Sequence, residues 1–369
     1  MAQHPASAVR RLRPEDGEAA APASRGFLER LPKWLIVVPL LIQWLLLSLR
    51  YRSAVLPSVA NPDITSGGLV GEGKTEYFRS MGSHALTATA RTGSFLVDPA
   101  SAAADAAVCM RQAGLAFPLI AKPDIGWCGF GVRHIASQAG LADYLAAFPA
   151  GERLLLQAYV PDEGEAGIFY VRDPGAASGR LLGLALRYFP QVTGDGRHSV
   201  GQLIARDARL RRLVKDPLHR SEPIGSQIPA HGHKVRLATI GSTRVGGLYR
   251  DGSALITPQL SAAIDLIALD MREFHFGRFD VRFHSLEALM RGEGFTIIEV
   301  NGAGSEAIEA WDPRHSPAAA FARIFSKQAL LFRIAAANRR RGFRPIGLGQ
   351  LARLHLRQQR LIPRYPPSN

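Results

Sequence analysis

Cysteine is scarce in this chain. Its 369 residues include only two cysteines, Cys109 and Cys128. Two cysteines cannot build the disulfide framework of a small secreted domain, so a reducing cytoplasm is the expected compartment. Hydrophobic residues make up 47% of the chain and charged residues 21%, proportions that exclude a largely disordered protein. The length is enough for two or three lobes, each with a sizeable core.

Acidic residues are missing from the C-terminal end. No Asp or Glu follows Asp312, whereas twelve Lys and Arg residues do. The whole chain has a net charge of +14, of which this segment holds +12, leaving +2 for residues 1–312. Such a segment is either a solvated helical face or a surface for anionic lipid, an acidic partner or nucleic acid. Nucleic acid is the least favoured of these partners.

Long hydrophobic runs are also rare, with one exception at residues 34–49, WLIVVPLLIQWLLLSL. Sixteen helical residues cover about 24 Å, less than the roughly 30 Å of a bilayer core. Pro39 and Gln43 weaken a spanning helix further, and no signal-peptide cleavage site follows. Three interpretations stay open: a helix buried in its own protein, a monotopic anchor and a short span. Tryptophans and basic flanks favour membrane contact, so peripheral or anchored association at the inner membrane face is expected beside the cytoplasmic location.

Changes in composition divide the chain into four segments. Residues 1–26 are rich in Ala, Pro and Arg without periodicity and are expected to be disordered, and residues 27–72 hold the hydrophobic run and an extended loop. Residues 73–312 mix strand-like and helix-like stretches whose neighbours suit antiparallel pairing, which predicts an α+β fold. Residues 313–369 predict a long amphipathic helix over about 316–341 and then a basic helix.

The stretch GLVGEGKT, residues 68–75, matches the phosphate-binding P-loop pattern letter for letter. A true P-loop follows a buried strand directly and opens a helix. The preceding residues, SVANPDITSG, include Pro62 and do not make a core strand. We therefore interpret the match as accidental. Lys74 keeps a predicted phosphate role, whereas Gly68 is expected to tolerate alanine.

Two predicted strands, GRFDVRF and FTIIEVNG, carry polar side chains near the end of the α+β region. Side chains two positions apart on a strand face the same side, so Arg278 projects with Asp280, and Glu299 projects with Asn301. If the strands pair, their oxygens form a ligand set suited to Mg²⁺, and the guanidinium can stabilise a transferring phosphoryl group. The alternative is a group of salt bridges on an exposed sheet face.

Lys122 ends the apolar stretch LIAKP and precedes a loop with Gly126, Gly129 and Gly131. This order suits a phosphate clamp, because the amine supplies charge and glycine backbone N–H groups can approach oxygens closely. Together with LLLQAYV, GDGRHSV, GRFDV and IIEVNGAGS, it resembles the ATP-grasp ligases. D-alanine–D-alanine ligase is one relative of this family, and cyanophycin synthetase shares a GDGRHS-like loop. The resemblance covers residues 73 to about 312.

The resemblance implies two α+β lobes that clasp ATP, here with an N-terminal hydrophobic helix and C-terminal basic helices. It implies that Lys74 and Lys122 contact the ATP phosphates, under the glycine loop. The adenine hinge would consist of Gln157, Ala158, Tyr159 and Val160, and Glu165 would take the ribose hydroxyls. Magnesium, or manganese, would be held by Asp280, Glu299 and Asn301. Arg278 and Lys122 would be catalytic.

The implied activity is an ATP- and Mg²⁺-dependent ligase that forms a C–N bond. A carboxylate would become an acyl phosphate, which an amine, or less favourably a thiol, would attack. Two other classes stay open: a kinase-like phosphotransferase on the same fold, and a non-catalytic, membrane-associated nucleotide-binding protein. Arg187 and Arg244 are further candidates for anion contacts.

The chain departs from the family in three places. Gln157 stands where relatives usually have Glu, and GAGSEAIEAWDP follows Asn301 in place of a Thr-x-Pro-Gly run. No N-terminal substrate-binding lobe can be identified before Lys74. The substrates are small carboxylates and amines by resemblance, and the sequence names neither one.

Overall fold

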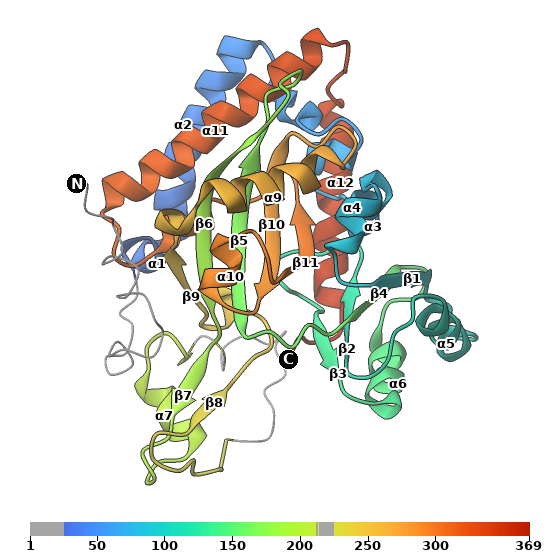
Figure 1. Ribbon diagram of the computed structural model, residues 1–369, viewed down its shortest axis with the longest axis vertical. Coiled ribbons are helices and arrows are strands. Elements are labelled where there is room, and N and C mark those ends of the chain that lie inside the picture. The colour runs from blue at the N-terminus through green and yellow to red at the C-terminus, as the bar shows by residue number, and fades with distance from the viewer. Residues whose placement is uncertain (1–25, 212, 214–224) are drawn as a thin grey trace, which may run out of the picture.

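Figure 1 shows a computed structural model of the chain, which describes residues 26–211, 213 and 225–369. Two antiparallel sheets organise the fold. The smaller sheet has the strand order β1-β4-β2-β3, and the larger has the order β11-β10-β5-β6-β9. A short third sheet pairs β7 with β8. The prediction of an α+β fold is confirmed.

The smaller lobe contains a four-stranded sheet and two helices. Its strands are β1 (Thr92–Leu96), β2 (Leu119–Pro123), β3 (Arg133–Ile135) and β4 (Arg153–Ala158). Its helices are α5 (Ala102–Gln112) and α6 (Gln138–Ala147). They share one core with the sheet, to which Ala106, Leu141 and Leu156 contribute. At Gly93 an added Cβ would lie 2.5 Å from the sulfur of Cys109, so glycine lets α5 approach β1 closely.

The larger lobe has helices on both faces of its sheet. The strands are β5 (Gly164–Val171), β6 (Arg180–Tyr188), β9 (Leu248–Asp251), β10 (Phe276–Phe283) and β11 (Phe295–Asn301). Side chains alternate along β5 between two cores. Ile168 and Tyr170 pack with helix α9 (Pro258–Leu269), whereas Phe169 and Val171 pack with helix α11 (Pro317–Arg340). The central strands are therefore buried on both faces.

The N-terminal hydrophobic helix is confirmed and is longer than the apolar run. Helix α1 (Phe27–Arg30) precedes α2 (Lys33–Tyr51), which lies along α11 in Figure 1. The following segment, predicted as an extended loop, forms the short 3-10 helices η2 (Leu56–Val59) and η3 (Thr65–Gly68). Asn61 explains why this segment can be buried. Its amide donates to the carbonyls of Gly67 and Phe276 and accepts from the N–H groups of His275 and Phe276.

The C-terminal helices pack on both lobes. Helix α12 (Leu348–Leu361) and η7 (Ile362–Arg364) follow α11, and Leu361 and Tyr365 enter the core of the smaller lobe. The remaining elements are α3 (Lys74–Ser80), α4 (Ser83–Thr87), β7 (Gln191–Thr193), α7 (Val200–Arg206), β8 (Lys234–Arg236), η4 (Thr243–Val245), η5 (Ser253–Leu255), α10 (Leu286–Met290) and η6 (Ile308–Trp311).

Within the described part of the chain, half of the basic residues after Asp312 form ion pairs. Their partners are carboxylates: Arg314–Asp312, Arg323–Asp251, Lys327–Glu309, Arg333–Asp173, Arg341–Glu273 and Arg357–Glu152. The acid-free segment is therefore complemented in part by acidic residues of the rest of the fold. The partnered side chains contribute less to an external basic surface than the sequence indicates.

Candidate active site

A cavity of about 490 Å³ lies between the two sheets. The smaller sheet lines it with Lys122 on β2 and Gln157 on β4, and the larger sheet lines it with residues of β5, β6, β9, β10 and β11. Of the residues predicted from the sequence, these line the cavity: Lys74, Lys122, Gly126, Gly129, Gln157, Ala158, Tyr159, Val160, Glu165, Arg278, Asp280, Glu299 and Asn301. Gly131 does not line the cavity, and its carbonyl accepts a 2.7 Å hydrogen bond from Tyr144.

The predicted pairing of the two polar strands is confirmed. β10 and β11 are antiparallel, with Arg278 opposite Asn301 and Asp280 opposite Glu299. The register shifts immediately after Asp280, so both opposed pairs lie on the same side of this irregularity. The sheet thus brings one guanidinium, two carboxylates and one amide to the same cavity wall, as the sequence predicts.

Asp280 lies at the centre of a buried charge network. Only 1% of its surface is exposed. Arg278 donates to both of its oxygens, at 2.6 Å and 3.1 Å, and Arg187 donates to Oδ2 at 3.0 Å. Burial alone would raise the pKa of Asp280, but these two guanidinium groups outweigh it and hold the pKa below its ordinary value. The carboxylate is therefore charged at neutral pH.

Arg187, a secondary candidate from the sequence, links two predicted site residues. Its guanidinium donates to Glu165 at 3.1 Å as well as to Asp280. Arg282 pairs with the other oxygen of Glu165 at 3.0 Å. Glu165 is consequently fixed between two cations at the cavity wall.

The two predicted phosphate lysines reach the same cavity from different elements. Lys122 is buried, and its amine donates to Gln157 Oε1 and to the carbonyl of Ile298, both at 2.9 Å. Burial lowers the pKa of Lys122 to about 8. Lys74 is the first residue of α3, and its amine lies 3.4 Å from Glu299 Oε1. Both amines thus lie at the wall of the same cavity.

GLVGEGKT is not a P-loop, in agreement with the sequence interpretation. Two 3-10 helices, not a strand, precede it. Thr75 donates through its N–H and its hydroxyl to Asp124, at 2.8 Å and 3.0 Å, and so anchors α3 to the smaller lobe.

The expected tolerance of Gly68 is wrong. This residue has φ +80°, and an added Cβ would lie 2.4 Å from the hydroxyl oxygen of Tyr77 and 2.6 Å from Cα of Gly302. Alanine at this position would therefore clash with backbone and would also strain the turn. The local sequence could not reveal the contact with Gly302, because Gly302 lies more than 200 residues further along the chain.

The glycine loop is held by residues that sequence reasoning gave no such role. Arg244 donates to the carbonyls of Cys128 and Gly129 and lies over the ring of Phe130, 4.1 Å from its centroid. From the C-terminal segment, Gln358 donates to the carbonyl of Gly126 at 3.0 Å. Tyr365 likewise donates to the carbonyl of Ile125 at 2.7 Å. The loop is thus tied to both lobes at the cavity edge.

Glu72 is a cavity residue that sequence reasoning missed. Burial raises its pKa to about 7, and its Oε2 atom has no hydrogen-bond partner within the described part of the chain. It lies beside Lys74 in GLVGEGKT, where the apparent P-loop drew attention to the glycines and the lysine. The segment before α3 thus supplies the cavity with an acidic group.

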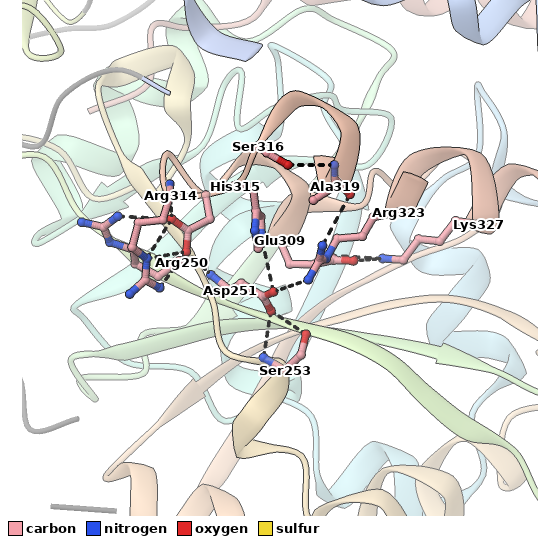
Figure 2. A network of polar contacts seen from close by, with 11 residues as sticks. Arg250, Asp251, Ser253, Glu309, Arg314, His315, Ser316, Ala319, Arg323 and Lys327 are labelled. Atoms are coloured by element: carbon pink, nitrogen blue, oxygen red, sulfur yellow. Dashed lines mark hydrogen bonds and ion pairs between the residues drawn. The ribbon is translucent and has the colours of Figure 1, made fainter. Parts of the chain in front are cut away.

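A second polar network, shown in Figure 2, connects β9, η6 and the start of α11. Lys327 on α11 pairs with Glu309 of η6 at 2.8 Å, and both side chains are buried. Asp251 accepts from Arg323 at 2.9 Å and lies 3.1 Å from His315. The network fixes η6, whose first residue, Ile308, lines the cavity.

The ligand set predicted for magnesium contains two carboxylates and one amide. Among the described residues, no group of three or more His, Cys, Asp or Glu side chains could hold a metal. Asp280, Glu299 and Asn301 nevertheless share the cavity wall, and their oxygens are the hard ligands that Mg²⁺ accepts beside phosphate oxygens and water. The residues present therefore fit a magnesium ion that arrives with a phosphate ligand.

No protein-family model matches this chain, and no curated protein matches it either. Three solved structures show a partial likeness in fold. A bifunctional glutathione synthetase from Pasteurella multocida aligns at 17% identity and a TM-score of 0.34, covering 68% of this chain and 36% of that chain. A carboxyaminoimidazole ribonucleotide synthase from Aspergillus clavatus, complexed with ATP, aligns at 13% identity and a TM-score of 0.34, covering 62% of this chain and 44% of that chain.

The third structure is the VanG D-Ala:D-Ser ligase from Enterococcus faecalis, at 15% identity and a TM-score of 0.36, covering 69% of this chain and 61% of that chain. This chain thus spans less than two thirds of the length of each of the three proteins. Within the chain itself, two antiparallel sheets enclose a cavity that the motif residues line from both sides. The arrangement of two α+β lobes around a cavity is the one that the resemblance to the ATP-grasp ligases predicts.

Proposed function

We propose that this protein is an ATP- and Mg²⁺-dependent ligase that joins a small carboxylate to an amine, or less favourably to a thiol, through an acyl phosphate. The observation that carries the proposal is the register of β10 and β11. It places Arg278, Asp280, Glu299 and Asn301 on one wall of a cavity, and Lys122 enters from the other lobe. Cations and oxygen ligands around one enclosed space suit a triphosphate with its metal.

In this proposal the protein acts by positioning and by charge. Lys74 and Lys122 hold the phosphates, and Arg278 stabilises negative charge on the transferred phosphoryl group. The glycine loop lies over the cavity edge and excludes water, which would otherwise hydrolyse the acyl phosphate. The adenine hinge at residues 157–160 and the ribose contact of Glu165 complete the proposed ATP site.

The proposed metal ligands are Asp280, Glu299 and Asn301. When bound, Mg²⁺ neutralises phosphate charge during the transfer, and Mn²⁺ accepts the same oxygen ligands. Asp280 already has Arg278 and Arg187 as partners, which keep it ionised. The proposed location is the cytoplasm, and membrane contact is a separate proposal.

The test is a screen for ADP release with paired pools of carboxylates and amines, followed by mass spectrometry of the products. The double variant Asp280→Asn, Glu299→Gln removes both proposed metal carboxylates and should lower the rate of ADP release at least about 100-fold. Glu287→Gln changes an exposed carboxylate on α10 and should leave the rate unchanged.

The products distinguish the remaining classes. Free phosphate, ADP and a condensed product support the ligase. A stable phosphorylated product would replace the ligase by the kinase-like phosphotransferase. If the double variant kept the physiological activity, the enzyme proposal would fail and a nucleotide-binding protein would take its place.

A further inference from the structure

Helix α2 exposes a continuous apolar face. The large hydrophobic residues on this face are Trp34, Leu35, Val37, Val38, Leu41, Ile42, Leu45, Leu46 and Leu49. Their spacing of three and four positions places them on one side of the helix. Leu45 and Leu46 are each 61% exposed and Leu49 is 75% exposed. An unpartnered apolar face of this size normally marks an interaction surface.

The opposite face of α2 is packed against α11 along its length. Gln43 donates to the carbonyl of Phe325, Gln328 donates to the carbonyl of Leu40, and Trp44 packs edge-on against Phe332 at 4.9 Å. The two helices lie side by side on the outside of the larger lobe in Figure 1. A helix attached in this way lies along the protein surface and does not leave the body of the protein.

This packing decides between the three interpretations of the hydrophobic run. α2 is not a buried core helix, because only 6% of its apolar window is buried. At 19 residues it is long and apolar enough to cross a membrane, so length does not exclude a span. The attachment of α2 to α11 does exclude a span, because a spanning α2 would carry the larger lobe into the bilayer. If α2 lies in the plane of the membrane, its apolar face contacts lipid while its other face stays packed on α11.

The charged residues on the two helices of this surface are of one sign. No acidic residue occurs between Glu29 and Asp63, and α11 contains none at all. Arg50 and Arg52 are exposed at the C-terminal end of α2, beside the C-terminal end of α11, where Arg339 donates to the carbonyl of Tyr51. These arginines form a basic frame beside the apolar face, and such a frame attracts anionic head groups. In a dimer formed through this face, the basic frame of one copy would lie against the equally basic frame of the other, and their repulsion disfavours such a dimer.

We propose that α2 docks this protein in the plane of a membrane that contains anionic lipid. The apolar face of α2 enters the boundary between head groups and acyl chains, and Arg50 and Arg52 contact the head groups. The proposal rests on the apolar face and its basic frame and is independent of any ligase activity.

The first test is flotation of the full chain with vesicles of phosphatidylcholine, with or without phosphatidylglycerol. The protein should bind the anionic vesicles, and high salt should weaken the binding. Leu45→Ser combined with Leu46→Ser should lower the partition coefficient by about tenfold or more, because two large apolar side chains leave the acyl boundary. Leu266→Ser changes an equally exposed leucine on α9 and should have no effect.

The second test separates docking from spanning. Pro32→Cys and Ala54→Cys place thiols at exposed positions flanking α2, in a chain with Cys109→Ala and Cys128→Ser. With protein added outside sealed vesicles, both thiols should react with a membrane-impermeant maleimide. Protection of one of the two would show a span and overturn the in-plane proposal.

Two other outcomes would overturn membrane docking. One is the absence of binding to either kind of vesicle. The other is a lipid-independent dimer that the Leu45→Ser, Leu46→Ser variant converts to a monomer, which would identify the occupant of the face as a second copy. An Arg50→Gln, Arg52→Gln variant should lose only the preference for anionic vesicles, which checks the role of the basic frame.

Discussion

Lys122 combines a predicted phosphate contact with a titration near neutral pH. Because burial lowers its pKa to about 8, the amine of the free protein is charged at pH 7 and loses its proton above pH 8. ATP affinity should therefore fall by up to about tenfold for each pH unit above about 8. Titration calorimetry with ATP between about pH 7 and 9 measures this fall in affinity.

The Lys122→Met variant is the control for this prediction. It has no titrating amine at the position, so its weaker ATP affinity should not change over the same pH range. An equal pH dependence in both proteins would assign the titration to another group. Gln157 and Ile298 hold the amine in place, so the charge and not the side-chain position is what changes.

Glu72 should make stability depend on pH. Its pKa is 4.5 as an ordinary glutamate and about 7 in the fold, so between these values the folded chain holds a proton that the unfolded chain has released. Stability should therefore fall as pH rises from about 4.5 to 7, by up to about 3 kcal/mol. Glu72→Gln should remove this loss, so the variant should unfold at higher urea than the wild type at about pH 8 but not at about pH 5.

Urea unfolding of the wild type, Glu72→Gln and the exposed-site control Glu287→Gln checks this prediction at both pH values. The control should behave as the wild type does. A gain in stability that is the same at both pH values would mean that packing, and not titration, is responsible.

At the scale of elements, the sequence predicted most strands of both sheets. β10 and β11 follow from period-two alternation and from turn residues between them, and their partnership follows from proximity in the chain. β1 was missed, because TGSFL lacks a run of β-branched residues and gains its place only through β4 and α5. The stretch DPASAAADAAVCMRQAG, residues 98–114, predicts a helix with Asp98 at its N-cap. The helix α5 begins instead at Ala102, because Asp98 accepts from the N–H of Ala100 in a local turn.

The cavity could be predicted only in part. The residues of the two polar strands, the two lysines and the glycine loop carry local patterns, and each was found. Arg244 and Gln358, which hold the glycine loop, come from segments without such patterns. Their role depends on contacts across more than 100 residues, which no local pattern encodes.

The buried pair between Lys327 and Glu309 makes a prediction about α11 and η6. Lys327→Met leaves the carboxylate of Glu309 buried without its cation, which should lower the free energy of unfolding by about 3–5 kcal/mol. Arg333→Met on the same helix removes an exposed pair with Asp173 and should cost no more than about 1 kcal/mol. Thermal unfolding measures both.

The double variant Lys327→Met, Glu309→Met tests whether the unpaired buried carboxylate causes this loss of stability. It removes both charges from the buried site, so it should recover most of the stability that the single variant loses. A double variant as unstable as Lys327→Met alone would show that the lysine acts through packing on Phe169, whose ring centroid lies 3.6 Å from its amine.

At the scale of the whole molecule, the C-terminal segment connects the lobes. α11 packs on the larger sheet, and α12 with the residues after it packs on the smaller one. Between them the chain passes the cavity edge, where Gln358 and Tyr365 bond to the glycine loop. The basic composition that marks this segment in the sequence thus accompanies a structural role that the charge pattern alone does not predict.

This role predicts a local effect of changes in α12. Leu361 is buried in the core of the smaller lobe, so Leu361→Ala should destabilise that lobe by about 2–5 kcal/mol. Leu356 is exposed on the same helix, and Leu356→Ala should change stability by less than about 0.5 kcal/mol. Hydrogen exchange followed by mass spectrometry resolves where the protection is lost.

In Leu361→Ala, exchange should rise in β1, β2 and β4 and stay unchanged in β5 and β10, because the two sheets belong to separate hydrophobic cores. The glycine loop should exchange faster as well, since Gln358 and Tyr365 flank the altered position and bond to it. Equal deprotection of both sheets would instead mean that the lobes unfold as one unit. In that case the cavity between the two sheets would lie within a single cooperative structure, and α12 would stabilise all of it.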